Sequence, residues 1–151
     1  MRSEPATPTR SAVDLAARAL ARRDRSETDL RRILAAKGVS DAEAADAVET
    51  LRRLGAVDDE RFARGAARAL ANRGYGDEAI VLRLEREGIE RTFVLAAVSE
   101  LRPEAERAAL LAGQRGPGAR TARWLVSRGF TADSVERALA TVAETDAAEL
   151  G

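Results

Sequence analysis

Three stretches of equal length decide the fold: LRRILAAKGVSDAEAADAVETL at 30–51, IVLRLEREGIERTFVLAAVSEL at 80–101 and TARWLVSRGFTADSVERALATV at 121–142. They align over their 22 residues without a gap. A glycine holds the same position in each copy, as Gly38, Gly88 and Gly129, and an apolar residue follows it. Agreement at seven or more positions indicates an internal repeat rather than chance.

Each copy predicts a helix, a glycine stop and a second helix. Ala, Leu, Arg and Glu, which favour helices, recur at helical spacing on both sides of the glycine. The glycine suits the left-handed conformation that ends many helices. Ser40 with Glu43 suits the cap that begins the next helix, and Ser26 with Asp29 is a weaker version of it. No alternating β-branched run predicts a strand.

A further helical stretch precedes each copy, at about 11–23, 59–72 and 104–113. Helices of about 11 residues are marginal alone in water, so each must pack against its neighbours. The expected fold is therefore all-α, with three tandem three-helix repeats whose neighbours share part of their core. The expected organisation is a disordered tail at 1–10, repeats at 11–55, 56–102 and 103–145, and a short tail at 146–151.

The composition excludes several classes of protein. The 151 residues include no Cys and no His, which excludes a disulfide framework, a thiolate zinc site and histidine catalysis. We expect no catalytic residue, no metal and no cofactor. No apolar run reaches the ~20 residues of a membrane span, and the first residues lack the apolar stretch of a secretory signal. We therefore expect a soluble, cytoplasmic protein.

One acidic cluster, Asp58, Asp59 and Glu60, allows two interpretations. Adjacent carboxylates could bind a metal or carry out acid–base chemistry. Acidic residues at the start of a helix also offset the helix dipole and cap its free N–H groups. Because Arg61 stands beside them at a predicted helix start, we favour caps and structural ion pairs.

Charge is blocked along the chain although the formal net charge is zero. Residues 10–37 hold eight basic and four acidic residues, and residues 102–128 hold six and two. These blocks are either solvated helix surfaces or faces that meet acidic protein or DNA phosphates. Tyr75, between two glycines, could stack on a base or on a partner, whereas we expect Trp124 to be partly buried and Phe130 to lie in the core. The candidate partner-binding residues are Arg22, Arg23, Arg25, Arg31, Arg32, Arg73, Tyr75, Arg120 and Arg123.

Three local stretches resemble the RecX family of bacterial recombination regulators. They are LARRDRSETDLR at 20–31 with the following Lys37-Gly38, LGAVDDERFA at 54–63, and the segment from Trp124 to Phe130. The resemblance covers about residues 11–142, and it is the combination of the acidic stretch with the repeated glycine that makes it specific.

The resemblance implies three tandem three-helix repeats that form an elongated, curved body. It also implies a regulator that binds within the groove of the RecA filament on single-stranded DNA. It implies inhibition of strand exchange, ATP hydrolysis and co-protease activity, and so a role in DNA repair, recombination and the SOS response. It implies a regulator rather than an enzyme, and we expect a monomer. The alternative is a helix-turn-helix-like transcriptional regulator, because helix pairs joined by a glycine turn suit that motif. The neutral net charge and the three copies count against this alternative.

Overall fold

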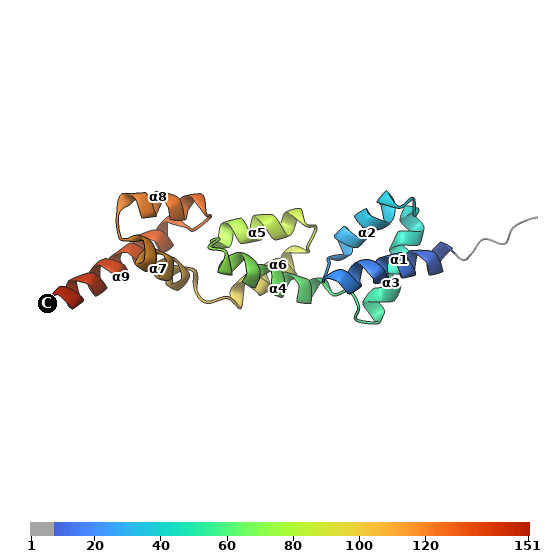
Figure 1. The fold of residues 1–151 in the computed structure, drawn as a ribbon, viewed down its shortest axis with the longest axis horizontal. Coiled ribbons are helices and arrows are strands. Elements are labelled where there is room, and N and C mark those ends of the chain that lie inside the picture. The colour runs from blue at the N-terminus through green and yellow to red at the C-terminus, as the bar shows by residue number, and fades with distance from the viewer. Residues whose placement is uncertain (1–7) are drawn as a thin grey trace, which may run out of the picture. The chain divides into compact units, whose positions relative to one another are not determined.

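The computed structural model describes residues 8–151, with side chains from Ala12 onward, and this part of the chain forms helices joined by short turns (Figure 1). The described residues contain no strand, which confirms the all-α class. The helices are α1 (Pro8–Arg22), α2 (Glu27–Ala36), α3 (Asp41–Arg53), α4 (Asp59–Asn72), α5 (Asp77–Arg86), α6 (Arg91–Ser99), α7 (Glu104–Arg115), α8 (Ala119–Ser127) and α9 (Ala132–Leu150).

The predicted and observed helices differ mainly at the two ends of the chain. Of the predicted tail 1–10, residues 1–7 lie outside the described residues, and 8–10 form the first turn of α1. A proline is well suited to a first helical turn because its N–H would have no partner there. At the other end, α9 continues through 146–150, since that segment is rich in Ala and Glu and contains no breaker before Gly151.

The repeated glycines end equivalent helices. Each has a positive φ, of 84° at Gly38, 82° at Gly88 and 91° at Gly129. After α2, the Val39 N–H donates to the Leu34 carbonyl at 3.0 Å, and after α8 the Phe130 N–H donates to the Leu125 carbonyl at 3.1 Å. This is the Schellman arrangement, in which a left-handed residue turns the chain back over the last helical turn. The predicted glycine stops are confirmed.

Hydroxyl groups begin three of the helices. The side-chain oxygens of Ser26, Ser40 and Thr131 accept hydrogen bonds from the backbone N–H three residues later, at 3.0, 3.2 and 3.3 Å. The two predicted serine caps are therefore confirmed. α8 differs, because it follows Gly118 and has no side-chain cap.

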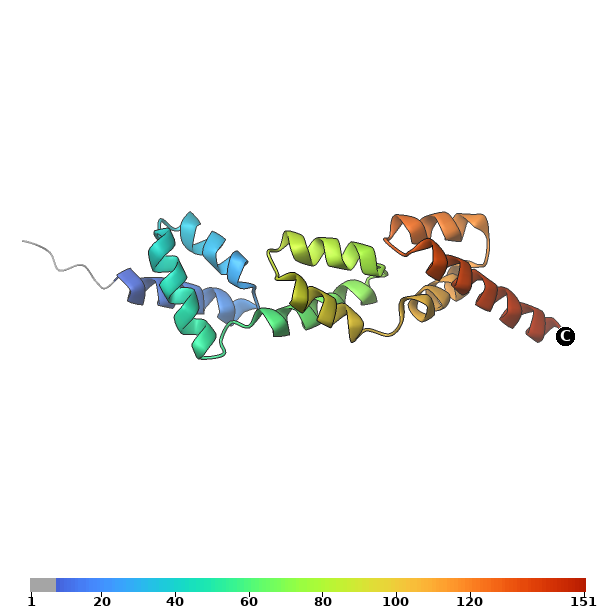
Figure 2. The same ribbon diagram turned by 180° about the vertical axis from the view of Figure 1, so that it is seen from behind.

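The described chain divides into two compact units. The first holds the residues up to Phe62 together with Glu87–Glu90, and the second holds Ala63–Arg86 with Arg91–Gly151. In the first unit α1 packs along α3, and α2 packs against both (Figure 1). In the second unit α7 packs along α9, α8 against α9, and α5 against α6 (Figure 2). The repeat boundaries at 55, 102 and 145 stay predictions.

The repeat in the sequence is also a repeat in burial. The leucines four residues before the glycines, Leu34, Leu84 and Leu125, are 0, 1 and 0% exposed. The equivalent alanines of the following helix, Ala47, Ala97 and Ala138, are 0, 2 and 1% exposed. Phe130 is buried and Trp124 half-buried, as predicted. None of the described helices is long and apolar enough to cross a membrane.

Candidate interaction surface

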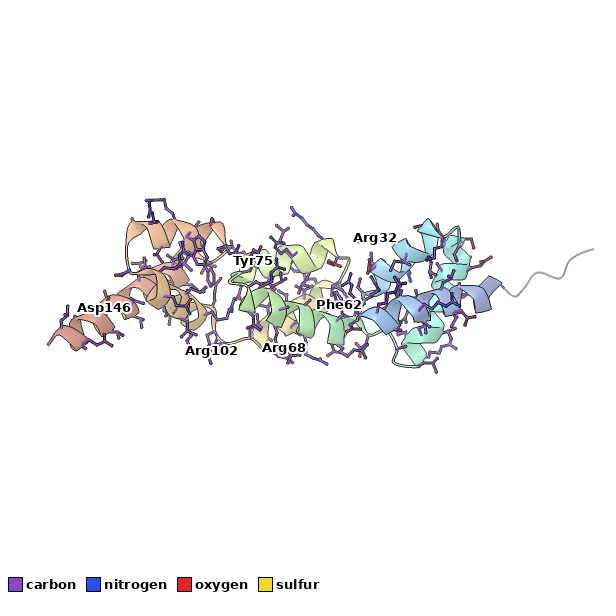
Figure 3. All side chains as sticks on the ribbon, in the orientation of Figure 1. Arg32, Phe62, Arg68, Tyr75, Arg102 and Asp146 are labelled. Carbon is purple, nitrogen blue, oxygen red and sulfur yellow. The ribbon has the colours of Figure 1, made fainter. Side chains whose placement is uncertain are left out.

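The candidate arginines of the first unit fall into two groups. Four are exposed, namely Arg22, Arg23, Arg31 and Arg32, the last labelled on α2 in Figure 3. Arg25 is different, because its Nε donates to the Ala19 carbonyl and its Nη1 to the Asp29 carboxylate, both at 3.0 Å. Its side chain is 14% exposed. Arg25 therefore fixes the turn between α1 and α2, and its guanidinium is largely used within the unit.

A cationic pocket of about 350 Å³ lies in the first unit. Aliphatic side chains and four cations line it: Leu15, Ala19, Ile33, Arg18, Arg22, Arg25 and Lys37. No carboxylate of the described residues lines it. Such a pocket attracts a carboxylate or phosphate group, because several positive charges act on one small volume. Arg18 and Lys37 are not among the residues predicted above, although Arg18 and Arg22 share a helix face at a spacing of four.

The centre of the second unit is a stack of one guanidinium and two aromatic rings. The Arg128 guanidinium carbon lies 3.9 Å from the centre of the Tyr75 ring and 5.6 Å from that of Trp124. Its Nε donates to the Gly74 carbonyl at 3.3 Å, and its Nη2 donates to the Arg73 carbonyl. Arg128 therefore caps the C-terminal end of α4 while it stacks on both rings.

Two glycine loops hold this stack in place. The Gly76 N–H donates to the Arg128 carbonyl at 2.8 Å, and the Glu78 N–H donates to the Gly129 carbonyl at 3.2 Å. A Cβ at Gly76 would lie 2.4 Å from the Phe130 nitrogen. The two loops thus meet backbone to backbone, and any side chain at position 76 would separate them.

Two guanidinium groups lie over the Tyr75 ring. The Arg83 guanidinium carbon lies 4.2 Å from the ring centre, and that of Arg128 lies 3.9 Å away. Figure 3 shows Tyr75 at the end of α5 near α8. The ring therefore stacks on arginines of its own unit, and its stacking on a base or a partner stays a prediction.

The second unit carries a set of guanidinium groups without carboxylate partners. In the described part of the chain, no ion pair joins a carboxylate to Arg73, Arg83, Arg115, Arg120, Arg123 or Arg128. Arg120 and Arg123 are exposed on α8, and Arg115 lies 3.9 Å from the centre of the Trp124 ring. Arg83, Arg115 and Arg128 are not predicted above, although Arg128 follows Trp124 by four residues. The cluster can bind phosphate or carboxylate oxygens.

Hydrogen bonds of the buried Arg107 and of Glu104 join helices of the second unit. Arg107 is 9% exposed, and its Nη2 lies 2.8 Å from the Asp77 carboxylate and 3.3 Å from the Tyr75 carbonyl. Glu104 accepts hydrogen bonds from the Asp77 N–H at 3.0 Å and from the Ser134 hydroxyl at 2.6 Å. These bonds join the starts of α5, α7 and α9.

The acidic cluster at 58–60 contains caps. The Asp58 carboxylate accepts from the Arg61 N–H at 3.0 Å, and the Asp59 carboxylate accepts from the Glu27 N–H at 2.8 Å. Burial raises the pKa of the Asp59 carboxyl, while its hydrogen bond with Glu27 acts in the opposite direction. No group of metal-ligating side chains occurs among the described residues. The helix-cap interpretation therefore accounts for Asp58 and Asp59.

Comparison with known proteins points to one family. A family model described as the first three-helix domain of RecX matches residues 12–51. The regulatory protein RecX of Stenotrophomonas maltophilia strain K279a is 35% identical over 142 residues, which cover 87% of this chain and 85% of that protein. The regulatory protein RecX of Halorhodospira halophila is 30% identical over 155 residues, which cover 95% and 96%.

Solved structures share the fold. The crystal structure of RecX from Lactobacillus salivarius has a TM-score of 0.81 at 16% identity, covering 91% of this chain and 98% of that one. A second crystal structure, of a regulatory protein RecX, has a TM-score of 0.75 at 22% identity and covers 87% and 72%.

Proposed function

This chain belongs to the RecX family of regulatory proteins, and we propose that it regulates the RecA recombinase by binding the filament that RecA forms on single-stranded DNA. Binding inhibits strand exchange, ATP hydrolysis and co-protease activity. The observation that carries the proposal is the similarity over 87% of the chain to a protein named as regulatory protein RecX. The chain acts through contacts rather than through chemistry of its own.

The cationic pocket of the first unit supports an anionic partner group. Arg18, Arg22 and Lys37 face a small volume with Arg25, which is already held in place by Asp29. A held guanidinium loses less side-chain entropy on binding than a free one. Exposed Arg31 and Arg32 on α2 add charge that steers a negatively charged filament toward the unit.

The unpaired guanidinium groups of the second unit support a second contact. Arg120 and Arg123 on α8, with Arg73 beside the Tyr75 ring, can pair with phosphates or with acidic side chains. Arg83 and Arg128 already stack on the Tyr75 ring, so the proposed contact rests on the unpaired guanidinium groups rather than on the ring. Two modest contacts on one chain reinforce each other when the partner is a repeating filament.

The test is a titration of RecA-dependent ATP hydrolysis on single-stranded DNA. Hydrolysis should slow at substoichiometric or equal amounts of the protein, and strand exchange should slow with it. Unchanged hydrolysis and strand exchange over a wide titration would overturn the proposal. A gel-shift titration with naked duplex DNA at moderate salt distinguishes the alternative, because a transcriptional regulator would bind duplex tightly without RecA.

A further inference from the structure

The middle repeat breaks the pattern of charge on the second helices. In the gapless alignment Arg31 and Arg32 of α2 correspond to Val81 and Leu82 of α5, and Leu82 corresponds to Arg123 of α8. Arg32 and Arg123 are exposed, and Leu82 is 48% exposed. The same outward position therefore carries a cation in the first and third repeats and a bare apolar side chain in the second.

Leu82 belongs to an apolar patch on α5 and α6, called here the α5–α6 patch. It comprises Val81, Leu82 and Leu95, of which Leu95 is 46% exposed. These residues line a shallow depression of about 320 Å³ in the second unit. Contiguous exposed apolar side chains rimmed by polar residues are characteristic of protein interaction sites.

The rim of the α5–α6 patch is acidic. Asp77, Glu78 and Glu85 line the depression together with one cation, Arg91. Arg91 pairs with Glu85 at 2.5 Å, and Asp77 pairs with the buried Arg107. Glu78 is exposed and takes part in no ion pair within the described part of the chain. Its charge is free to meet a cation.

We propose that the α5–α6 patch docks a segment of the protein partner that carries apolar side chains flanked by Lys or Arg. Apolar contact excludes water from Leu82 and Leu95, and the acidic rim favours basic flanks. The same rim repels DNA phosphates and acidic peptides, so this face recognises a different chemistry from the arginine surfaces. The inference rests on the proposed function, in which the partner protein is RecA.

Cross-linking tests the contact directly. The chain has no Cys, so L82C carries a single thiol that accepts a benzophenone maleimide. L110C is the matched control, because Leu110 is also in the second unit and is 55% exposed. On the RecA filament, L82C should cross-link to a RecA segment rich in apolar and basic residues, and L110C should not. Cross-linking of L82C to DNA, to an acidic segment or to a second copy of the chain would overturn the proposal.

Inhibition of ATP hydrolysis provides the second measurement. L82R and L95R should each raise the concentration needed for half-inhibition by about tenfold, and L110R should leave it unchanged. E78R should raise the concentration needed for half-inhibition more than E78Q does. If the wild-type chain inhibits RecA while L82R and L95R inhibit equally well, the docking proposal fails and the proposed function stands. If the wild-type chain does not inhibit, both fail.

Discussion

The carboxylate of Asp59, the first residue of α4, accepts a hydrogen bond of 2.8 Å from the backbone N–H of Glu27, the first residue of α2. In the same way, the carboxylate of Glu104, the first residue of α7, accepts a hydrogen bond of 3.0 Å from the backbone N–H of Asp77, the first residue of α5. In each case an acid that begins one repeat caps the second helix of the preceding repeat. The free N–H groups at a helix start are thus satisfied from outside the helix.

Replacing Asp59 with Ala should destabilise the protein by about 1 kcal/mol, because α2 loses one of its caps. Burial raises the pKa of the Asp59 carboxyl above its ordinary 3.8. The folded state therefore binds its proton more tightly than the unfolded state, and the contribution of this group falls as pH rises from about 3.8 through the higher folded pKa. The free energy of unfolding of wild type and of D59N can be measured in urea at pH 4 and at pH 7. The stability of wild type relative to D59N should be higher at pH 4 than at pH 7. An equal difference at both pH values would contradict the prediction.

Replacing Glu104 should destabilise the protein more than replacing Asp59. Besides Asp77 and Ser134, its carboxylate accepts from the Thr131 hydroxyl at 2.9 Å. E104A leaves these donors without a partner and should cost about 2–3 kcal/mol in the free energy of unfolding. E104Q keeps acceptor capacity and should cost less. Hydrogen exchange should show faster exchange at the starts of α5 and α9 in E104A, and unchanged exchange there would refute the role assigned to Glu104.

Replacing Arg128 should loosen the aromatic cluster. R128A removes its hydrogen bonds to the carbonyls of Arg73 and Gly74 together with its stacking on Tyr75 and Trp124, a loss of about 1–2 kcal/mol. Trp124 is the only Trp, so its fluorescence should shift to the red and become easier to quench. The control is R123A, which changes an exposed residue of α8, the helix that carries Trp124. It should leave both stability and fluorescence as in wild type.

The three equivalent glycines provide a graded series. All three have a positive φ, which costs an alanine about 1 kcal/mol. A Cβ at Gly38 meets nothing within 4 Å, whereas one at Gly129 would lie 2.4 Å from the Ala79 Cβ. One at Gly88 would lie 2.3 Å from the Thr28 Oγ1. G129A and G88A should therefore lower the melting temperature clearly more than G38A, and an equal loss in all three would show that only the backbone conformation matters.

The arginines of the first unit should control inhibition without controlling folding. Changing Arg22, Arg23, Arg31 and Arg32 together to Glu should abolish inhibition of RecA, because it reverses the charge around the cationic pocket. Circular dichroism should show unchanged helicity. R31E/R32E can be compared with R52E/R53E, which makes the same charge change at adjacent exposed arginines of α3 and also removes their ion pairs with Glu27 and Glu49. Inhibition retained by the fourfold variant would exclude this face.

The sequence predicts the features that recur in each of the three repeats. The aligned glycines predict the left-handed helix stops, and the aligned leucines and alanines predict the buried positions, because both follow from local conformation and helical period. It cannot predict contacts such as Asp59 with Glu27, which are separated by 32 residues. Such contacts depend on how helices that are distant in the sequence pack together.

The same limit applies to the candidate surface. An exposed and an internally bonded arginine look alike in sequence, so Arg25 is grouped with Arg22 although its guanidinium is held by Ala19 and Asp29. Tyr75 between two glycines gives no sign in the sequence that Arg83 and Arg128 stack on its ring. Pairing and stacking partners become visible only when the helices are packed.

The capping of the second helices is uneven. In α2 two first-turn N–H groups donate to Ser26 and Asp59, and in α5 two donate to Glu104 and to the Gly129 carbonyl, whereas α8 follows Gly118 and has no side-chain cap. Amide protection against exchange in the first turn should accordingly be lower in α8 than in α2 and α5. Helix α8 is the one that carries Arg120 and Arg123, so the most easily frayed turn would be the one that presents charge to a partner.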